Sequence, residues 1–406
     1  MKIVVLKFGG TSVGTIKKIK KVAEIIANYK KKNYKVIVVS SAMSGVTNEL
    51  IKKSFEISKN FSESEHDVLV SSGEQIACSL IAGSLIHKGY KSRSWLSWQV
   101  PIITQGPYKN SRINQINNKR IIKYLKEGGI PIITGFQGIN IEDRITTIGR
   151  GGSDASAIMI AKFFKAERCV IYTDVEGVYT TDPNKITKAK KIKEISYEEM
   201  LEMASLGAKV MQPVSIQDAR LNRINIEVKS SFVKKSGTLI TKRSNIANNK
   251  IVTGISSTHN DSKVSLIGVR DKPGVAASIF KPLSKNSINV DMVVQNISAN
   301  GKETDLTFTI KTEDLNKTKK IINLNKSIKF RKLLLKKDVS KISVIGVGMI
   351  TTPGVTFRMF QALANKKINI QVISTSEIKI SVLIDKKNNK KALLALHKEF
   401  NLEDKK

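Results

Sequence analysis

The chain has 406 residues, enough for about two or three domains, and its 41% hydrophobic content excludes global disorder. No apolar run reaches the roughly 18 residues of a membrane span, and the N-terminus lacks a signal-peptide cleavage site. The formal charge of +35 is typical of nucleic-acid binding, but the lysines spread along the whole chain without a zinc-finger, basic-zipper or RNA-binding motif. We therefore interpret them as solvated surface and do not expect nucleic acid as a partner.

The N-terminal part alternates predicted strands and helices. Residues 2–8 are apolar and β-branched, which indicates a buried strand, and residues 16–27 carry the apolar stripe of an amphipathic helix. Further buried strands are predicted at 36–41, 130–134 and 169–173. This alternation predicts a three-layer αβα domain with a mainly parallel sheet, whose ligands gather at the carboxyl ends of the strands. The polar segment 57–66 predicts a surface loop.

The titratable residues that often bind metals are few and scattered. Cys78 and Cys169 lie in apolar surroundings, which favours buried free thiols in the reducing cytoplasm. The four histidines show no ligand spacing, so we predict no metal site formed by the protein alone.

The C-terminal part contains an internal repeat. Periodicity is lost over 234–250, which predicts a domain boundary. The sequences Lys263–Val269, Pro273-Gly274-Val275 and Ile288-Asn289-Val290 then recur as Lys341–Val347, Pro353-Gly354-Val355 and Ile368-Asn369-Ile370. Each copy predicts a small βαββαβ module. The predicted domains are 1–245, 263–335 and 341–406, with 251–262 as a strand that joins the pair.

Two glycine-rich turns predict anion binding. Gly149–Asp154 precedes the helical run Ala155–Ala161, and its glycine amides, the guanidinium of Arg150 and the following helix N-terminus suit a carboxylate or phosphate. Ser153 or Asp154 is predicted to cap that helix. Lys7 ends the first strand before Gly9-Gly10, which suits phosphoryl transfer, although the pattern is not that of a P-loop. Each turn, taken alone, is also compatible with a structural role.

Two further stretches offer carboxylates near predicted strand or helix ends. Glu74 lies near the start of a helix, where it is either a favourable first-turn acid or a partner for a substrate ammonium. The stretch 173–183 combines carboxylates, hydroxyls and a ring that suit a nucleotide, although Asp182-Pro183 is also typical of an ordinary turn.

Taken together, these motifs resemble the aspartokinase (aspartate kinase) family over essentially the whole chain. The resemblance rests on Lys7–Val13, Ser41-Ala42-Met43 with Thr47-Asn48, Gly73-Glu74, Gly135–Gly138, Gly149–Asp154 and Thr173–Pro183, followed by the repeat. It implies an amino-acid-kinase domain and two ACT domains, as in the monofunctional class. The implied reaction is the ATP-dependent phosphorylation of the side-chain carboxylate of L-aspartate to 4-phospho-L-aspartate, which begins lysine, threonine and methionine biosynthesis.

The resemblance also implies roles for individual residues. Lys7 stabilises the transferring phosphate and Asp154 orders Lys7, while Arg150 binds the α-carboxylate of aspartate and Glu74 its ammonium. The implied substrate-binding residues are Thr47, Glu74, Arg150, Gly151, Gly152 and Ser153. The implied ATP-binding residues are Lys7, Phe8, Gly9, Gly10, Ser41, Thr173, Asp174, Tyr179, Asp182, Lys209 and Val210. Mg²⁺ is expected to be carried by the ATP phosphates. Asn184-Lys185 departs from the family, which commonly has an arginine after Asp-Pro.

In the repeat, the resemblance implies feedback inhibition by lysine, threonine or both, at a site between the ACT domains. The implied effector-binding residues are Asp271, Gly274, Ala276, Asn289, Asp291, Gln295, Thr356, Asn369, Ile370, Thr375 and Ser376. A homo-oligomer formed through the ACT domains is expected, and a purely structural dimerisation module is the alternative.

Two rival functions remain open from the sequence. A kinase of the same fold could act on acetylglutamate, glutamate or a nucleotide, although the Gly149–Asp154 motif and the ACT pair argue against it. A ligand-sensing regulator that binds nucleic acid without catalysis is the other, motivated by the net charge of +35.

Overall fold

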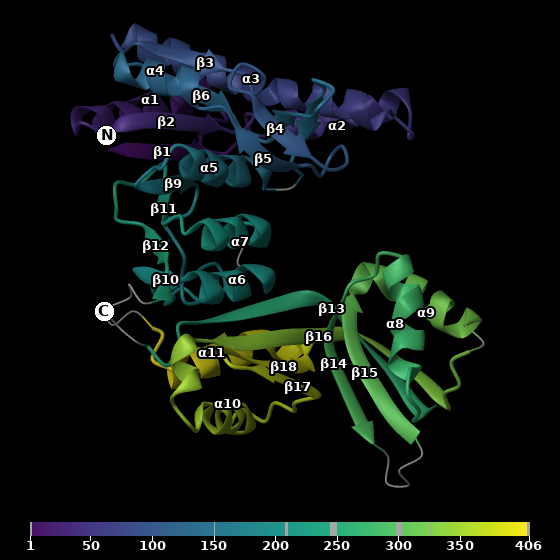
Figure 1. Cartoon of the computed structure of the whole chain (residues 1–406). Helices are drawn as coiled ribbons and strands as arrows, with labels where there is room; N and C mark the ends of the chain where they lie inside the picture. Colours follow the sequence, from purple (N-terminus) through teal and green to yellow (C-terminus); the bar gives the residue numbers. More distant parts are fainter. Residues whose placement is uncertain are drawn as a thin grey trace. The chain divides into compact units, whose positions relative to one another are not determined.

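The structure is a computed structural model that describes residues 2–149, 151–207, 210–243, 250–297, 303–325 and 327–403 (Figure 1). The chain forms two compact units. The first comprises Met1–Val178 and Lys191–Asn248, and the second comprises Tyr179–Lys190 and Asn249–Lys406.

An eight-stranded sheet forms the centre of the first unit, in the order β10-β12-β11-β9-β1-β2-β6-β3. Its strands are β1 (Ile3–Phe8), β2 (Lys35–Ser40), β3 (Ser92–Trp95), β6 (Ile130–Thr134), β9 (Arg168–Thr173), β10 (Glu194–Ser196), β11 (Ile226–Ser230) and β12 (Thr238–Thr241). Neighbouring strands are parallel except β11 and β12, so the predicted mainly parallel sheet is confirmed. β12 lies inside the stretch where sequence periodicity is lost.

Side-chain alternation along β1 assigns its residues to two faces of the sheet. Val4, Leu6 and Phe8 pack into the core beneath α1 (Ile16–Lys31) and α3 (Glu63–His87). Lys7 therefore points to the opposite face, where it meets α5 (Gly152–Phe163). Helices on both faces of the sheet confirm the three-layer αβα class.

Helix α3 crosses the first unit as a core helix. By length and composition alone this 25-residue helix could span a membrane, but half of its most apolar window is buried in the protein. Its buried residues include Ala77, Cys78, Ile81 and Leu85, which pack against the sheet. The helix begins at Glu63, so the prediction of a loop through residue 66 was wrong in its last residues. Charged residues fill its first turn, which hid the helical pattern.

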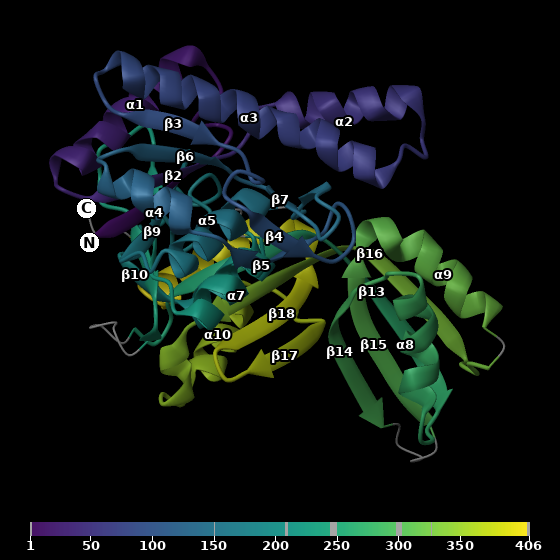
Figure 2. The same cartoon turned by 45° about the horizontal axis from the view of Figure 1, so that its top comes forward.

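The remaining elements of the first unit surround the strand ends. A small second sheet has the order β5-β4-β7-β8, with β4 (Ile102–Gln105), β5 (Arg112–Ile116), β7 (Gln137–Ile139) and β8 (Ile145–Thr147). The other helices are α2 (Val46–Ile57), α4 (Lys119–Lys126), α6 (Tyr197–Ser205) and α7 (Pro213–Asn222). α2 lies beside α3 in both views (Figures 1 and 2).

The second unit contains the repeat, built on a six-stranded antiparallel sheet of order β14-β15-β13-β16-β18-β17. The first copy contains β13 (Gly254–Arg270), α8 (Val275–Lys285), β14 (Val290–Ile297), β15 (Glu303–Lys311) and α9 (Leu315–Leu324). The second contains β16 (Lys332–Ile345), α10 (Val355–Ala364), β17 (Val372–Ser376), β18 (Lys379–Asp385) and α11 (Asn389–Glu399). Gly274 and Gly354 begin the first helix of each copy with φ of 87° and 88°.

The two copies share their long strands. The start of β13 pairs with the end of β16, with Gly254 opposite Ile345, and the start of β16 pairs with the end of β13, with Lys332 opposite Ile267. The first half of β13 therefore completes the sheet of the second copy, and the first half of β16 completes the sheet of the first copy. The pairing joins residues far apart in sequence, which periodicity within one repeat does not show.

The segment Tyr179–Lys190 belongs to the second unit, although the chain before and after it belongs to the first. Ile186 packs into the core of the second repeat copy. The Thr180 hydroxyl donates to Leu402 O (3.1 Å), accepts from Lys190 N (3.0 Å) and lies 2.9 Å from His397 Nε2. Because that hydroxyl has one proton, Nε2 of His397 is the protonated nitrogen.

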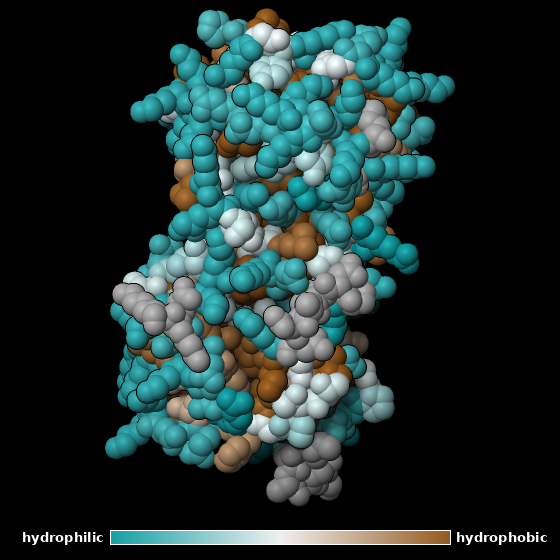
Figure 3. Space-filling view, turned by 90° about the vertical axis from the view of Figure 1, so that its left-hand side faces the viewer, coloured by the Kyte–Doolittle hydropathy of each residue, from teal (hydrophilic) through white to brown (hydrophobic). Residues whose placement is uncertain are grey.

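One face of the molecule carries mainly hydrophilic side chains. Figure 3 shows this face, on which apolar side chains are scattered between the hydrophilic ones.

Candidate functional site

The site is built first on an ion pair at the end of β1. Lys7 Nζ lies 2.6 Å from Asp154 Oδ1, and each residue is 8% exposed. Lys7 comes from the sheet and Asp154 from the first turn of α5. A buried pair of this kind places an ammonium at a fixed position beside the strand ends, which suits charge stabilisation during phosphoryl transfer.

The ends of four parallel strands are joined by backbone hydrogen bonds around that pair. Gly9 N donates to Tyr172 O (3.1 Å), Ser41 N donates to Phe8 O (3.0 Å), and Gly135 N donates to Ser40 O (3.0 Å). The turns after β1, β2, β6 and β9 therefore lie side by side. This arrangement confirms that the small-residue turns meet at one edge of the sheet.

Glycine is required where these turns touch. A Cβ added to Gly10 would lie 2.9 Å from Ala42 O, and one added to Gly135 would lie 2.9 Å from the Ser153 Cβ. Real Cβ atoms do not approach so closely, so the turns after β1 and β6 could not keep their positions with larger residues. Ser153, Lys7 and the turn after β2 are thereby brought into one neighbourhood.

Glu74 brings a second carboxylate to this neighbourhood from α3. Its Oε1 accepts a hydrogen bond from Ala42 N at 3.0 Å, and its Oε2 has no hydrogen-bond partner among the described residues. The residue is buried, and desolvation raises the pKa of Glu74 to about 7 although the bond from Ala42 lowers it. A Cβ on Gly73 would lie 2.8 Å from the Ala42 Cβ, so glycine lets α3 approach this turn.

The turn before α5 has a different cap from the one predicted. Gly151 is the N-cap, with φ of 76° and no side-chain cap bond, and α5 begins at Gly152. Ser153 and Asp154 lie inside the first turn, so the prediction that one of them caps the helix was wrong. Gly151 adopts a left-handed backbone that glycine takes easily, and it has no side chain with which to cap the helix. The side chain of Asp154 is thus free to pair with Lys7. Arg150 lies outside the described residues.

The proposed nucleotide residues fall into different parts of the chain. Thr173 ends β9, and its carbonyl accepts from Ser231 N (3.0 Å), while Asp174 is exposed. Tyr179 and Asp182 belong to the second unit. Asp182 Oδ1 accepts from Asn184 N at 3.0 Å, the geometry of an ordinary Asx turn.

The other predicted kinase residues are placed as follows. The ring of Phe8 is fully buried and stacks on Tyr172 with 4.9 Å between centroids, so only its backbone faces the turn. Thr47 and Val210 are half-buried, and Lys209 lies outside the described residues. Lys185, where the sequence departs from the family, points its Nζ at His259 Nε2 (3.1 Å) in the second unit.

The predicted effector residues all lie in the second unit. Asp271, Gly274, Asn289, Gln295, Thr356, Asn369, Thr375 and Ser376 are exposed, and Ala276 and Ile370 are half-buried. Asp291 forms an ion pair with the buried Lys341. An effector ammonium would therefore compete with Lys341 for this carboxylate.

Sequence reasoning missed one buried group beside the site. Asp67 on α3 is fully buried and accepts hydrogen bonds from Lys109 and Thr147. It directly follows the polar segment 57–66, for which the sequence predicted a surface loop. A signal was nevertheless present, because Asp67 stands seven residues before Glu74 and so shares a helix face with it.

Comparisons with known proteins agree with this architecture. Residues 2–230 match the amino acid kinase family, and residues 264–324 and 342–400 match the ACT domain. The fold, the strand-end site and these matches define a small-molecule kinase with the amino-acid-kinase fold and two ACT domains.

Individual relatives narrow the class. Aspartate kinase of Stutzerimonas stutzeri is 42% identical over 405 residues, covering 99% of this chain and 98% of the relative. Aspartokinase of Geobacillus stearothermophilus is 42% identical over 402 residues, with the same coverage. The chain therefore belongs to the aspartokinase family.

Solved structures share the fold. The crystal structure of Escherichia coli aspartokinase III in complex with aspartate and ADP aligns with a TM-score of 0.79 at 24% identity. The structure of the same enzyme in complex with lysine and aspartate aligns with a TM-score of 0.80, also at 24% identity. They cover 98% of this chain and 99% and 100% of the aligned chains.

Proposed function

We propose that this protein transfers the γ-phosphoryl group of ATP to the side-chain carboxylate of L-aspartate, forming 4-phospho-L-aspartate and ADP. Membership in the aspartokinase family supports the reaction. The single structural observation that carries it is the buried Lys7–Asp154 pair at 2.6 Å, set where the strand-end turns meet and beside the turn that Glu74 contacts.

Lys7 performs the electrostatic part of the reaction. Its ammonium neutralises negative charge that develops on the transferring phosphoryl group, and Asp154 holds it in place. The Gly9-Gly10 turn and the turn at Ser41 line the phosphate path in this proposal. No protein base is needed, because the attacking carboxylate of aspartate is already ionised near neutral pH.

Glu74 and Arg150 account for the choice of an amino acid as acceptor. Oε2 of Glu74, which has no hydrogen-bond partner within the described part of the chain, is an acceptor for the substrate ammonium, and ionised Glu74 matches its charge. Arg150 follows Gly149 and suits a two-point contact with the α-carboxylate. The second carboxylate is then left to attack phosphorus in line.

Mg²⁺ belongs to the ATP substrate in this proposal. Among the described residues, no three His, Cys, Asp or Glu side chains gather as a metal site, and Asp154 is engaged by Lys7. A cation coordinated mainly by nucleotide phosphates fits this donor set, because Mg²⁺ commonly uses substrate phosphates and one or two carboxylates.

Regulation by lysine, threonine or both follows from the ACT pair. The paired Gly274 and Gly354 turns and the exposed residues around them form the proposed effector site, and effector binding favours an inactive arrangement. A homo-oligomer formed through the ACT domains and a cytoplasmic location complete the proposal. Neither Asn184 nor Lys185 is assigned a nucleotide contact.

An assay of ATP consumption with L-aspartate and with L-glutamate tests the function, repeated with lysine and threonine added separately and together. We expect aspartate-dependent ADP formation that at least one effector lowers. Activity on glutamate alone would identify the rival kinase. Salt-sensitive retention on DNA or RNA without kinase activity would identify the regulator instead.

A further inference from the structure

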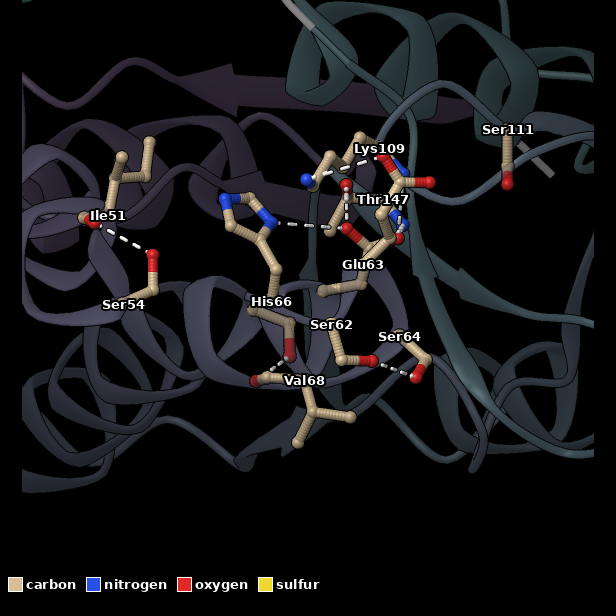
Figure 4. Close-up of polar contacts among 12 residues, drawn as sticks. Ile51, Ser54, Ser62, Glu63, Ser64, His66, Val68, Lys109, Ser111 and Thr147 are labelled. Atoms are coloured by element: carbon tan, nitrogen blue, oxygen red, sulfur yellow. Dashed lines mark hydrogen bonds and ion pairs between the residues drawn. The ribbon is translucent and has the colours of Figure 1, made fainter. Parts of the chain in front are cut away.

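We propose that Asp67 is a positioning residue for the aspartate-binding turn. It fixes the end of β8, which leads into Gly149, relative to Glu74. The proposal rests on the function above and deepens it, because it assigns a residue that tunes the affinity for the amino-acid substrate. Figure 4 shows Thr147, Lys109 and His66 gathered around this point of α3.

The Asp67 carboxylate is fully buried and is satisfied by neutral donors. Its Oδ2 accepts from Lys109 N (2.9 Å) and from Thr147 N (2.8 Å), and its Oδ1 accepts from the Thr147 hydroxyl (2.8 Å). His66 Nδ1 lies 3.5 Å from Oδ1. One carboxylate thus joins α3 to the loop 106–111 and to the end of β8.

The loop 106–111 and the chain that leaves β8 meet at Gly149. Ser111 N donates to Thr147 O (2.9 Å), which closes the loop 106–111 against the end of β8. A Cβ on Gly149 would lie 3.1 Å from Lys109 O and 3.0 Å from Asn110 Oδ1, so this loop touches Gly149 directly. Arg150, the proposed ligand of the α-carboxylate, is the next residue.

On its inner side the end of β8 is held by β7, where Thr147 pairs with Gln137 and Ile148 N donates to Phe136 O (3.0 Å). β8 has three residues and is an edge strand, so the outer side of Thr147 has no strand partner in the four-stranded sheet. Its N–H is taken by Asp67 instead. Lys109 has φ of 64°, a left-handed conformation that is uncommon for lysine and that the bond to Asp67 supports.

Helix α3 carries three anchors on one face. Asp67 binds Thr147, the carbonyl of Ser71 accepts from Gln137 Nε2 (2.9 Å), and Glu74 binds Ala42. These positions are spaced as i, i+4 and i+7, and a rise of about 1.5 Å per residue separates the two carboxylates by about 10 Å along the helix. The helix therefore sets the span between the ammonium partner and the carboxylate-binding turn.

Substitutions at both ends of the interaction test this role. Asp67→Ala leaves two backbone N–H groups without their acceptor, and we expect KM for L-aspartate to rise about tenfold, with KM for ATP within about twofold. Thr147→Val removes only the hydroxyl, and we expect a rise of about threefold. In Asp67→Asn the amide oxygen still accepts both N–H bonds, so KM for aspartate should stay within about twofold of wild type.

Leu125→Ala in α4 is the matched control. Leu125 is fully buried and lies outside the network, so its truncation lowers Tm through a cavity without changing KM for aspartate. If Asp67→Ala lowers Tm as Leu125→Ala does and leaves KM for aspartate unchanged, the proposal is overturned. If Asp67→Ala does not fold, Thr147→Val takes its place, and an unchanged KM for aspartate in that variant overturns the proposal.

Failure of the proposed kinase function can be distinguished from failure of the Asp67 assignment. A folded wild-type protein without aspartate-dependent ADP formation would overturn that function. An active wild type with unchanged KM for aspartate in Asp67→Ala and Thr147→Val would overturn only the assignment of Asp67.

Discussion

Glu74 makes the capture of aspartate depend on pH near neutrality. Burial raises its pKa from 4.5 to about 7, which corresponds to about 3 kcal/mol for ionising this carboxyl in the empty site. Because the folded pKa is raised, the associated stability is present below about pH 4.5 and is lost as pH rises through 7. The ammonium of bound aspartate offsets the cost, so binding releases a proton from Glu74 below pH 7.

The expected size of the effect follows from the ionised fraction. With a pKa of about 7, Glu74 is about one-tenth ionised at pH 6 and about nine-tenths ionised at pH 8. If only the ionised form binds the ammonium, kcat/KM for aspartate should rise about tenfold between these pH values and level off above pH 8.

The assay is kcat/KM for L-aspartate from about pH 5.5 to pH 8.5, by coupled detection of ADP, in wild type and in Glu74→Gln. Glutamine keeps the size and the acceptor for Ala42 N but does not ionise. We expect a low, flat profile for the variant. The same rise in both proteins, or a flat wild-type profile, would refute the assignment of Glu74.

Three further predictions concern other parts of the molecule. Lys7→Ala should lower kcat by about 10²-fold or more, whereas Arg150→Ala should mainly raise KM for aspartate; unchanged steady-state kinetics in either variant would show that its role is misassigned. Gly73→Ala should lower Tm and weaken aspartate binding, because its Cβ would lie 2.8 Å from Ala42 Cβ. Gly83→Ala on the same helix meets no atom within 4 Å and should be neutral or stabilising by about 1 kcal/mol. Equal effects of the two substitutions on Tm and on aspartate binding would contradict this prediction. Burial lowers the pKa of His397, so the stability that this residue contributes to the second unit should be present above about pH 6.5 and be lost as pH falls through the folded pKa. If Tm falls with decreasing pH by the same amount in wild type and in His397→Gln, this prediction is contradicted.

Local sequence patterns predicted most of the fold. Buried apolar runs such as residues 2–8 indicated the parallel strands, and small-residue turns indicated the edge where the site forms. Lys7 and Asp154 stand far apart in sequence, yet each motif indicated the same chemistry, and the structure pairs them at 2.6 Å.

The features that local patterns missed depend on long-range contacts. β12 forms within a stretch without periodicity because β11 and β10 supply its partners. The exchanged halves of β13 and β16 and the insertion of Tyr179–Lys190 into the second unit also depend on distant segments. Asp67 was not singled out, because its hydrogen-bond partners Lys109 and Thr147 are distant in sequence.

The most direct test of the central claim is the trapping of the acyl phosphate with hydroxylamine. Wild-type protein, ATP and L-aspartate should yield aspartyl hydroxamate, and L-glutamate in place of aspartate should yield none. Lys7→Ala should lose most of the product. A folded wild-type protein that forms hydroxamate only with glutamate, or with neither amino acid, would contradict the claim that this strand-end site holds aspartate against the terminal phosphate of ATP.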